Sequence, residues 1–307
     1  MRIIVTGGTG LIGKPLTGTL AAAGHEVTVL TRNPSAVAPR LAAGVRTHAW
    51  DARTSEGWAH LIDGADAVIH LAGENIAGTG FLPSRWTPAR KRLIAESRIQ
   101  SGLALVEAIE AAETKPRVFI QASAVGYYGV HGDEVIDESH GPGADFLSSV
   151  CVSWEESTQP LEEMGVRRVI ARTGNVLSMD GGSLPFSVLQ FRLFAGGRLG
   201  SGDQYFSWIH IEDEVAALRF LLEHEEAQGP FNLTAPNPVT NREFTRTLGR
   251  VLNRPSFLFV PETLLRLVLG EISTLVLDGQ RVVPSRLLEL GFKFRFPELF
   301  YALRDLL

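Results

Sequence analysis

The chain has 307 residues, of which 45% are hydrophobic and 21% are charged, and its formal net charge is −5. A chain of this length buries most of its unfolded surface, so it needs no disulfide framework, and its single cysteine allows none within the chain. The acidic balance gives no electrostatic basis for binding nucleic acid, no apolar run approaches the ~20 residues of a membrane span, and no signal peptide opens the sequence. We therefore expect a cytoplasmic protein.

Short β-branched runs alternate with helical patterns over the first half of the chain, which is typical of βαβ units in a parallel sheet. The expected strands cover residues 2–7, 26–32, 45–50, 65–73, 117–123 and 167–173. Helices are expected between them at about 11–23, 34–43, 56–62, 88–113 and 146–164. The strands are almost continuously apolar, as strands covered on both faces are. The pattern predicts an α/β fold with a Rossmann-type doubly wound parallel sheet.

The regular alternation of strands and helices ends after residue 173. Gly-rich loops there flank a short helical segment, and a later helix and strand return toward the sheet. We predict an NAD(P)-binding Rossmann domain of residues 1–173 plus about 208–235. A smaller, mostly helical C-terminal substrate lobe is predicted for residues of about 174–207 plus 236–307. A cleft between two such parts is the expected ligand site, because ligands of open α/β sheets bind outside the carboxyl ends of the strands.

The clearest motif is a glycine-rich turn that reads GGTGLIG, directly after the first expected strand and at the start of a helix. Glycines allow a tight turn and a close backbone approach to a pyrophosphate, while the helix N-terminus supplies unpaired N–H groups. This context predicts dinucleotide binding. The cofactor-binding residues expected here are Gly7, Thr9, Gly10, Leu11, Ile12 and Gly13.

The end of the second expected strand indicates which dinucleotide is bound. A carboxylate there would accept hydrogen bonds from the ribose 2′-OH of NAD, but this chain has Thr31 and Arg32. A guanidinium suits a 2′-phosphate, so the sequence favours NADP(H) over NAD(H). Asp51, after the third strand, either approaches the adenine or caps a turn.

Six segments resemble the epimerase-like subgroup of the extended short-chain dehydrogenase/reductase family over essentially the whole chain: TGGTGLIG, HLAGENIA, RWTPARKRLIAESRI, QASAVGYYG, GSGDQYFSWIHIEDEV and VVPSRLLELGFKFRFPEL. The resemblance implies a Rossmann-type fold, NADP(H) binding and a small-molecule pocket under the C-terminal lobe, but no particular substrate. Extended members of this family commonly form homodimers through a helical bundle, which here would use the exposed faces of the helices expected at 88–113 and 146–164, so a homodimer stays open. The cofactor-lining residues that it implies are Leu71, Ala72, Gly73 and Glu74, with Ala122 and Ser123 near the nicotinamide.

Typical family members pair a tyrosine with a lysine four residues further along one helix, so that the ammonium lowers the pKa of the phenol that transfers the proton. The matching segment here reads DFLSSVCVSWEE. With Glu155 setting the register, the two positions fall on Leu147 and Cys151, and a shift by one residue gives no better match. The standard dyad is therefore missing, and Cys151 fits a small buried helix residue better than a nucleophile.

Other polar groups remain as catalytic candidates. Ser123 is a possible contact to a substrate oxygen, and Tyr127 or Tyr128 is a possible acid, although loop aromatics also pack over cofactors. Two functions stay open. One is an NADP-dependent oxidoreductase or epimerase-like enzyme with atypical catalytic groups. The other is a non-catalytic NADP(H)-binding sensor or regulatory protein that acts through a partner.

Substrate recognition is expected to involve Arg85 and Trp86 before the long helix, and Gln204 and Trp208 in a later loop. Arginine and aromatic groups together suit a sugar nucleotide or another small anionic ligand with a stacking face. The same residues would equally serve ordinary packing of the lobe.

Overall fold

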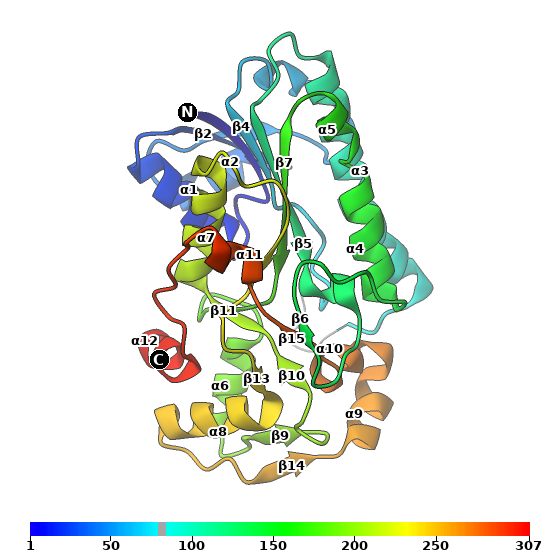
Figure 1. The fold of residues 1–307 in the computed structure, drawn as a ribbon, viewed down its shortest axis with the longest axis vertical. Coiled ribbons are helices and arrows are strands. Elements are labelled where there is room, and N and C mark those ends of the chain that lie inside the picture. The colour runs from blue at the N-terminus through cyan, green and yellow to red at the C-terminus, as the bar shows by residue number, and fades with distance from the viewer. Residues whose placement is uncertain (79–83) are drawn as a thin grey trace.

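The computed structural model describes residues 1–78 and 84–307. At its centre is a seven-stranded sheet in the order β12-β7-β5-β4-β1-β2-β3, and every neighbouring pair is parallel (Figure 1). Its strands are β1 Arg2–Thr6, β2 Glu26–Thr31, β3 Arg46–Ala49, β4 Ala67–His70, β5 Val118–Ala124, β7 Arg167–Thr173 and β12 Gly229–Leu233. The order reverses between β1 and β4, where doubly wound folds bind ligands. The predicted Rossmann-type α/β fold is confirmed.

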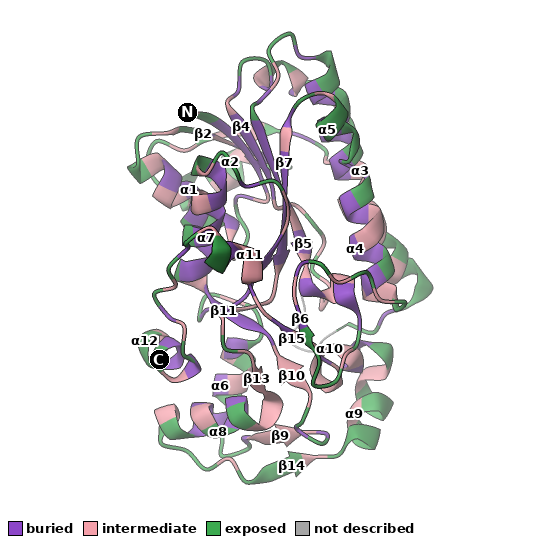
Figure 2. Ribbon diagram, viewed as in Figure 1, coloured by how far each residue is buried: buried purple, intermediate pink, exposed green. Residues whose placement is uncertain are grey.

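Helices cover both faces of the sheet. On one face α1, α7 and α11 bury Leu16, Leu218 and Leu287 against the strands, and on the other α3 and α5 bury Ile109 and Leu161 (Figure 2). The helices of these layers are α1 Gly13–Ala22, α7 Ile211–Glu223, α11 Ser285–Glu289, α3 Pro88–Ala111, α4 Phe146–Glu156 and α5 Pro160–Glu163. Within the described ranges, no helix has both the length and the apolarity needed to cross a bilayer.

A second core forms beyond the carboxyl ends of the strands, where α6, α8 and α12 pack around Trp208 and Phe244 (Figure 1). The helices outside the sheet layers are α2 Pro34–Val37, α6 Leu184–Arg192, α8 Asn241–Leu252, α9 Glu262–Leu269, α10 Thr274–Leu277 and α12 Leu299–Leu306. The short strands outside the sheet are β6 Val135–Ile136, β8 Asn175–Leu177, β9 Gly197–Leu199, β10 Tyr205–Phe206, β11 Trp208–His210, β13 Val239–Thr240, β14 Leu258–Val260 and β15 Arg281–Val282. The domain boundaries stay a prediction, and α11 of the expected lobe packs on β12 of the sheet.

Three expected helices are shorter than their patterns predict. The segment 56–62 forms only a 3-10 turn at Ala59–Leu61, because Gly57 before it has a left-handed φ of 80°. The segment 34–43 stops being α-helical at Val37, and Pro39 lies in the 3-10 turn that follows. The helix expected over 146–164 divides into α4 and α5 at Pro160, which has no N–H to continue the ladder.

Glu214, on α7, has a carboxyl group that is buried where this helix packs on the sheet. Its side chain is fully inaccessible, Oε1 accepts a hydrogen bond of 2.8 Å from Thr173 Oγ1, and Oε2 has no partner among the described residues. Burial raises the pKa of Glu214 to about 8. The folded protein therefore holds a proton here at neutral pH.

We expect Glu214→Gln to flatten the pH dependence of the free energy of unfolding. The unfolded chain loses this proton near the ordinary pKa of 4.5, whereas the folded chain keeps it to about pH 8. Between these values the unfolding free energy of the native protein falls as pH rises, by up to about 1.4 kcal/mol per pH unit. Urea titrations across this range measure the slope, with exposed Glu226→Gln as the control. Equal slopes in the two variants would contradict the assignment.

Candidate functional site

Main-chain atoms leave no room for a side chain at two positions of the turn between β1 and α1. Gly7 has a φ of 68°, and a Cβ there would lie 2.6 Å from the carbonyl of Leu71. A Cβ on Gly13 would lie 2.2 Å from Gly7 O. No side chain caps α1 at Ile12, and because Lys14 N–H donates to Gly10 O and Pro15 has no N–H, Gly13 is the first-turn residue whose N–H is open to an oxygen-rich ligand. The remaining predicted residues of the turn are Thr9 and Gly10, which are exposed, and Leu11, which is half-buried.

The loop after β4 lies directly beside this turn. Ala72 N–H donates a hydrogen bond of 3.2 Å to Thr6 Oγ1 at the end of β1, so the two loops meet at the switch point of the sheet. Leu71 and Gly73 flank that contact in the chain. Glu74 is held in place, because Oε1 accepts 2.8 Å from Arg90 Nη1. The structure thus brings Leu71 and Ala72, just after β4, next to the glycine turn, whereas Gly73 and Glu74 lie against α3.

The end of β2 presents a free cation. Arg32 is exposed, and its guanidinium makes no hydrogen bond or ion pair with residues 1–78 or 84–307. Thr31 precedes it at the last position of the strand. Asp51 has a different role, because Oδ1 accepts the N–H groups of Arg53 and Thr54 at 2.8 and 2.9 Å. Of its two sequence interpretations, the structure displays the turn cap.

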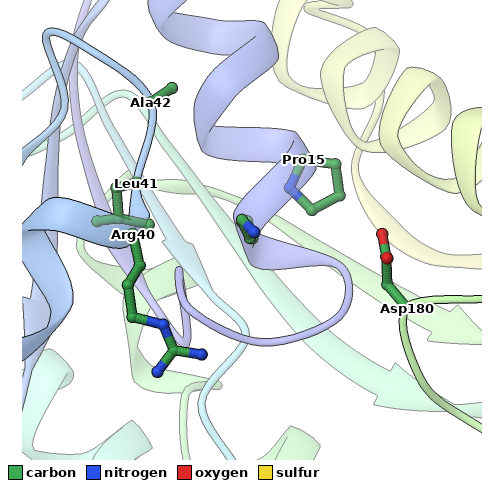
Figure 3. A pocket seen from close by; sticks show the side chains of 6 residues that line it. Pro15, Arg40, Leu41, Ala42 and Asp180 are labelled. Atoms are coloured by element: carbon green, nitrogen blue, oxygen red, sulfur yellow. The ribbon is translucent and has the colours of Figure 1, made fainter.

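A cavity of about 380 Å³ opens beside the first turn of α1 (Figure 3). Figure 3 shows Arg40 and Asp180 on opposite sides of that turn. Lys14 and Arg40 are exposed cations here, and sequence analysis missed both. A basic residue immediately after the glycine turn was an available signal for Lys14. The lining residues are Lys14, Pro15, Arg40, Leu41, Ala42 and Asp180.

A buried charged network lies at the carboxyl ends of β5 and β7. Ser123 Oγ donates 2.6 Å to Glu155 Oε1, and the Arg172 guanidinium binds both oxygens of Glu155, at 3.0 and 2.8 Å. Burial by itself lowers the pKa of Arg172, but its bonds to Glu155 outweigh that effect and raise it above its ordinary value. Ala122 precedes Ser123 on the same strand and is half-buried. The network fixes Ser123 at the edge of the expected nicotinamide site.

The two candidate tyrosines have different surroundings. Tyr128 is wholly buried, its hydroxyl donates 2.7 Å to Asn232 Oδ1 and accepts 3.1 Å from Arg172 Nη1, and burial raises its pKa to about 12. These contacts are those of a structural phenol. Tyr127 is half-buried, with the Arg172 guanidinium 3.4 Å from its ring centroid, and its hydroxyl bonds to no described residue. Of these two tyrosines, Tyr127 is the one whose phenol has no hydrogen-bond partner in the described chain.

The structure also shows why the two dyad positions of α4 offer no proton carrier. Cys151 Sγ donates to Ala124 O at 3.8 Å, and burial raises the pKa of the thiol to about 11. Leu147 packs close to Gly126, where a Cβ would lie 3.4 Å from Leu147 Cβ. A buried, protonated thiol is a poor nucleophile.

Arg85 and Trp86 act as packing groups in this structure. The Arg85 guanidinium donates to the carbonyls of Leu267 and Val268 at the end of α9, at 2.6 and 3.0 Å from Nη2. Trp86 is 8% exposed, and its indole N–H donates 2.9 Å to Ile76 O. The Arg85 contacts join the segment before α3 to the C-terminal elements, and Trp86 is buried, while the Arg85 side chain stays exposed.

Gln204 and Trp208 hold the lobe together in the same way. Gln204 Nε2 donates to the carbonyls of Leu199 and Val276, at 3.0 and 2.7 Å. Trp208 is fully buried, and its indole N–H donates 3.2 Å to Asn237 O. Of the two roles that sequence analysis left open for these residues, the geometry displays packing.

The parallel sheet and its glycine turn define a protein with a Rossmann-type nucleotide-binding fold. The chain belongs to the NAD dependent epimerase/dehydratase family, which matches residues 3–234, and this confirms the relationship that its motifs predict. A domain of unknown function, DUF1731, matches residues 260–306.

Relatives match the chain along its whole length. An epimerase family protein of Staphylococcus epidermidis is 40% identical over 309 residues and covers 100% of this chain and 99% of its own. The epimerase family protein YfhF of Bacillus subtilis is 39% identical over 308 residues, covering 100% and 98%. Among solved structures, human epimerase family protein SDR39U1 with NADPH is 35% identical, with a TM-score of 0.88 and coverage of 100% and 99%. A nucleoside-diphosphate sugar epimerase of Corynebacterium glutamicum is 33% identical with a TM-score of 0.77, and this chain covers 58% of it.

Proposed function

We propose that this protein binds NADPH at the carboxyl edge of its sheet and transfers hydride between the nicotinamide and a small anionic substrate, as an oxidoreductase or an epimerase. The observation that carries the cofactor choice is Arg32, an exposed guanidinium without a partner in the described chain, where an NAD-binding protein would place a carboxylate. The human relative described with NADPH supports the same choice. A sugar nucleotide is one substrate class that fits, given the name of the Corynebacterium relative.

We expect Arg32→Ala to lower the affinity for NADPH about tenfold or more and to leave NADH binding unchanged, because only NADPH carries the 2′-phosphate. Calorimetric titrations with NADPH, NADP⁺, NADH and NAD⁺ measure this difference. Arg92→Ala, which removes an exposed cation from α3, is the control. Equal affinities for all four dinucleotides would contradict the NADPH preference, and binding of none would contradict the proposal as a whole.

Tyr127 is the proposed proton carrier, with Ser123 beside it at the end of β5. With any carbonyl substrate found by screening NADPH oxidation, Tyr127→Phe is expected to lower turnover about 100-fold and to leave NADPH affinity unchanged. Tyr128→Phe is expected to keep turnover but to lower the free energy of unfolding by about 1–3 kcal/mol, because Asn232 and Arg172 lose a buried partner. Stopped-flow kinetics and urea unfolding separate the two effects. Unchanged turnover in Tyr127→Phe would exclude the phenol as the acid.

A non-catalytic NADP(H)-binding sensor is the second candidate, and one observation favours it. At the positions of the family dyad, α4 has Leu147 and the buried thiol of Cys151. Such a protein would bind NADPH as described above but would oxidise it with no member of a broad carbonyl panel. The screen therefore separates the two functions.

A further inference from the structure

Arg98, on α3, carries a guanidinium with unused donors inside the fold. Its Nη1 donates 3.0 Å to Glu74 O and 3.0 Å to Ile94 O. Nε and Nη2 make no hydrogen bond with any described residue. A Cβ on Gly73 would lie 3.1 Å from the Arg98 Cζ and 3.3 Å from both Nε and Nη2, so the guanidinium lies directly against the loop after β4. A half-buried arginine with free N–H groups is suited to an oxygen-rich ligand.

The guanidinium also lies close to α4, which packs against α3 and against β5 (Figure 1). Its Cζ lies 5.0 Å from the ring of Trp154. Cys151, one turn before Trp154 on the same helix, donates from Sγ to the carbonyl of Ala124 at the end of β5. The charge of Arg98 is therefore placed between the loop after β4 and the carboxyl end of β5.

This position lies on one side of the switch point of the sheet. The glycine turn and Arg32 follow β1 and β2, and in the proposed function they hold the adenosine half of the cofactor. Because β4 and β5 lie on the other side of β1 in the strand order, a dinucleotide that crosses the carboxyl edge brings its nicotinamide half toward Arg98.

We propose that Arg98 binds oxygen atoms in the nicotinamide half of the cofactor and so positions the nicotinamide ribose. In this role Arg98 is the fixed cation of the site, since α4 has no lysine. The inference rests on the proposed NADPH binding. The planar fork of a guanidinium presents two parallel N–H groups, which suit adjacent hydroxyl or phosphate oxygens. Glu74 and Ile94 engage one nitrogen through main-chain carbonyls, and this orients the other two.

The test compares NADPH with adenosine 2′,5′-bisphosphate, a fragment that lacks the nicotinamide half. Arg98→Gln is expected to weaken NADPH binding about tenfold or more in calorimetry, while binding of the bisphosphate changes less than about twofold. Arg98→Lys keeps the charge without the fork and is expected to fall between Arg98→Gln and the native protein. Arg92→Gln, on the exposed face of the same helix, is expected to bind both ligands as the native protein does. By contrast, Arg32→Ala is expected to weaken both.

Each result decides the inference. A folded Arg98→Gln variant that binds NADPH as tightly as the native protein would overturn the inference. Equal losses of affinity for NADPH and the bisphosphate would also overturn it, because they indicate general damage to the site. If Arg98→Gln does not fold, Arg98→Lys carries the test, and an unchanged ratio of the two affinities would overturn the inference. A native protein that binds neither ligand would overturn the proposed function together with this inference. If the native protein binds both, failure of the variants concerns Arg98 alone.

Discussion

Replacing Glu155 with glutamine is expected to lower the free energy of unfolding by about 3 kcal/mol. Glu155 and Arg172 form an ion pair of 2.8 Å whose side chains are only 9% and 5% exposed. Removing one member of such a pair leaves an uncompensated buried charge, which typically costs about 3–5 kcal/mol. The lower end of this range applies because the glutamine amide keeps an oxygen that accepts hydrogen bonds from Ser123 and Arg172.

A matched exposed pair provides the control for this measurement. Glu26 and Arg46 form an ion pair of 2.7 Å with side chains 65% and 64% exposed. Glu26→Gln is therefore expected to change the unfolding free energy by less than about 1 kcal/mol. Urea unfolding of both variants compares the same chemical change in a buried and an exposed setting. Equal losses would show that the buried network contributes no more than a surface pair.

The double variant Glu155→Gln with Arg172→Met tests the cause of the loss. Replacing both charges removes the unpaired guanidinium, so part of the lost free energy is expected to return. The recovery is incomplete, because Arg172 also donates to Tyr128 and lies over the ring of Tyr127. A double variant no more stable than Glu155→Gln alone would contradict the unpaired charge as the cause.

The architecture could be predicted because its signals are local in the sequence. Strands covered on both faces must be apolar throughout, and this made the strands from Arg2–Thr6 to Arg167–Thr173 recognisable. The glycine turn could be recognised in the sequence because no other residue fits the close backbone contact between Gly7 and Leu71. Helix lengths were less predictable, since Gly57 and Pro160 interrupt segments whose apolar pattern continues beyond them.

The site was harder to predict because its chemistry depends on distant residues. Tyr127 and Tyr128 are neighbours in one 3-10 turn, η3 Val125–Tyr128. Their different roles follow from Arg172 and Asn232, which arrive from β7 and β12. The composition of a short segment carries no signal for such an arrangement.

Dependence on distant residues also explains why the roles of the four predicted substrate residues could not be decided from the sequence. Arginine and tryptophan suit ligand binding and lobe packing equally, and the choice depends on which carbonyl groups lie nearby after folding. For Arg85 these carbonyls come from α9, and for Trp208 the carbonyl belongs to Asn237. Sequence analysis did not identify Arg98. Its position in the sequence gives no sign that Glu74 O engages one of its nitrogens and leaves two others without a partner in the described chain.

Replacing Gly13 with alanine is expected to abolish NADPH binding in calorimetry. The new Cβ would lie 2.2 Å from Gly7 O and 2.7 Å from Gly8 Cα, and main-chain atoms cannot move aside as a flexible side chain can. The turn must open, which displaces the N–H groups that the proposed function assigns to the diphosphate of the cofactor. The strain is expected to lower the free energy of unfolding by about 1–3 kcal/mol as well.

Gly18→Ala is the matched control, since it makes the same substitution in the interior of α1. A Cβ there would lie 3.6 Å from Ala42 Cβ, which is ordinary contact, and alanine favours the helix by about 0.5–1 kcal/mol over glycine. We therefore expect Gly18→Ala to bind NADPH normally and to unfold at a slightly higher urea concentration. Normal NADPH binding by Gly13→Ala would show that the close backbone contact at the turn is dispensable, and the cofactor would then have to be held from the β2 and β4 sides alone.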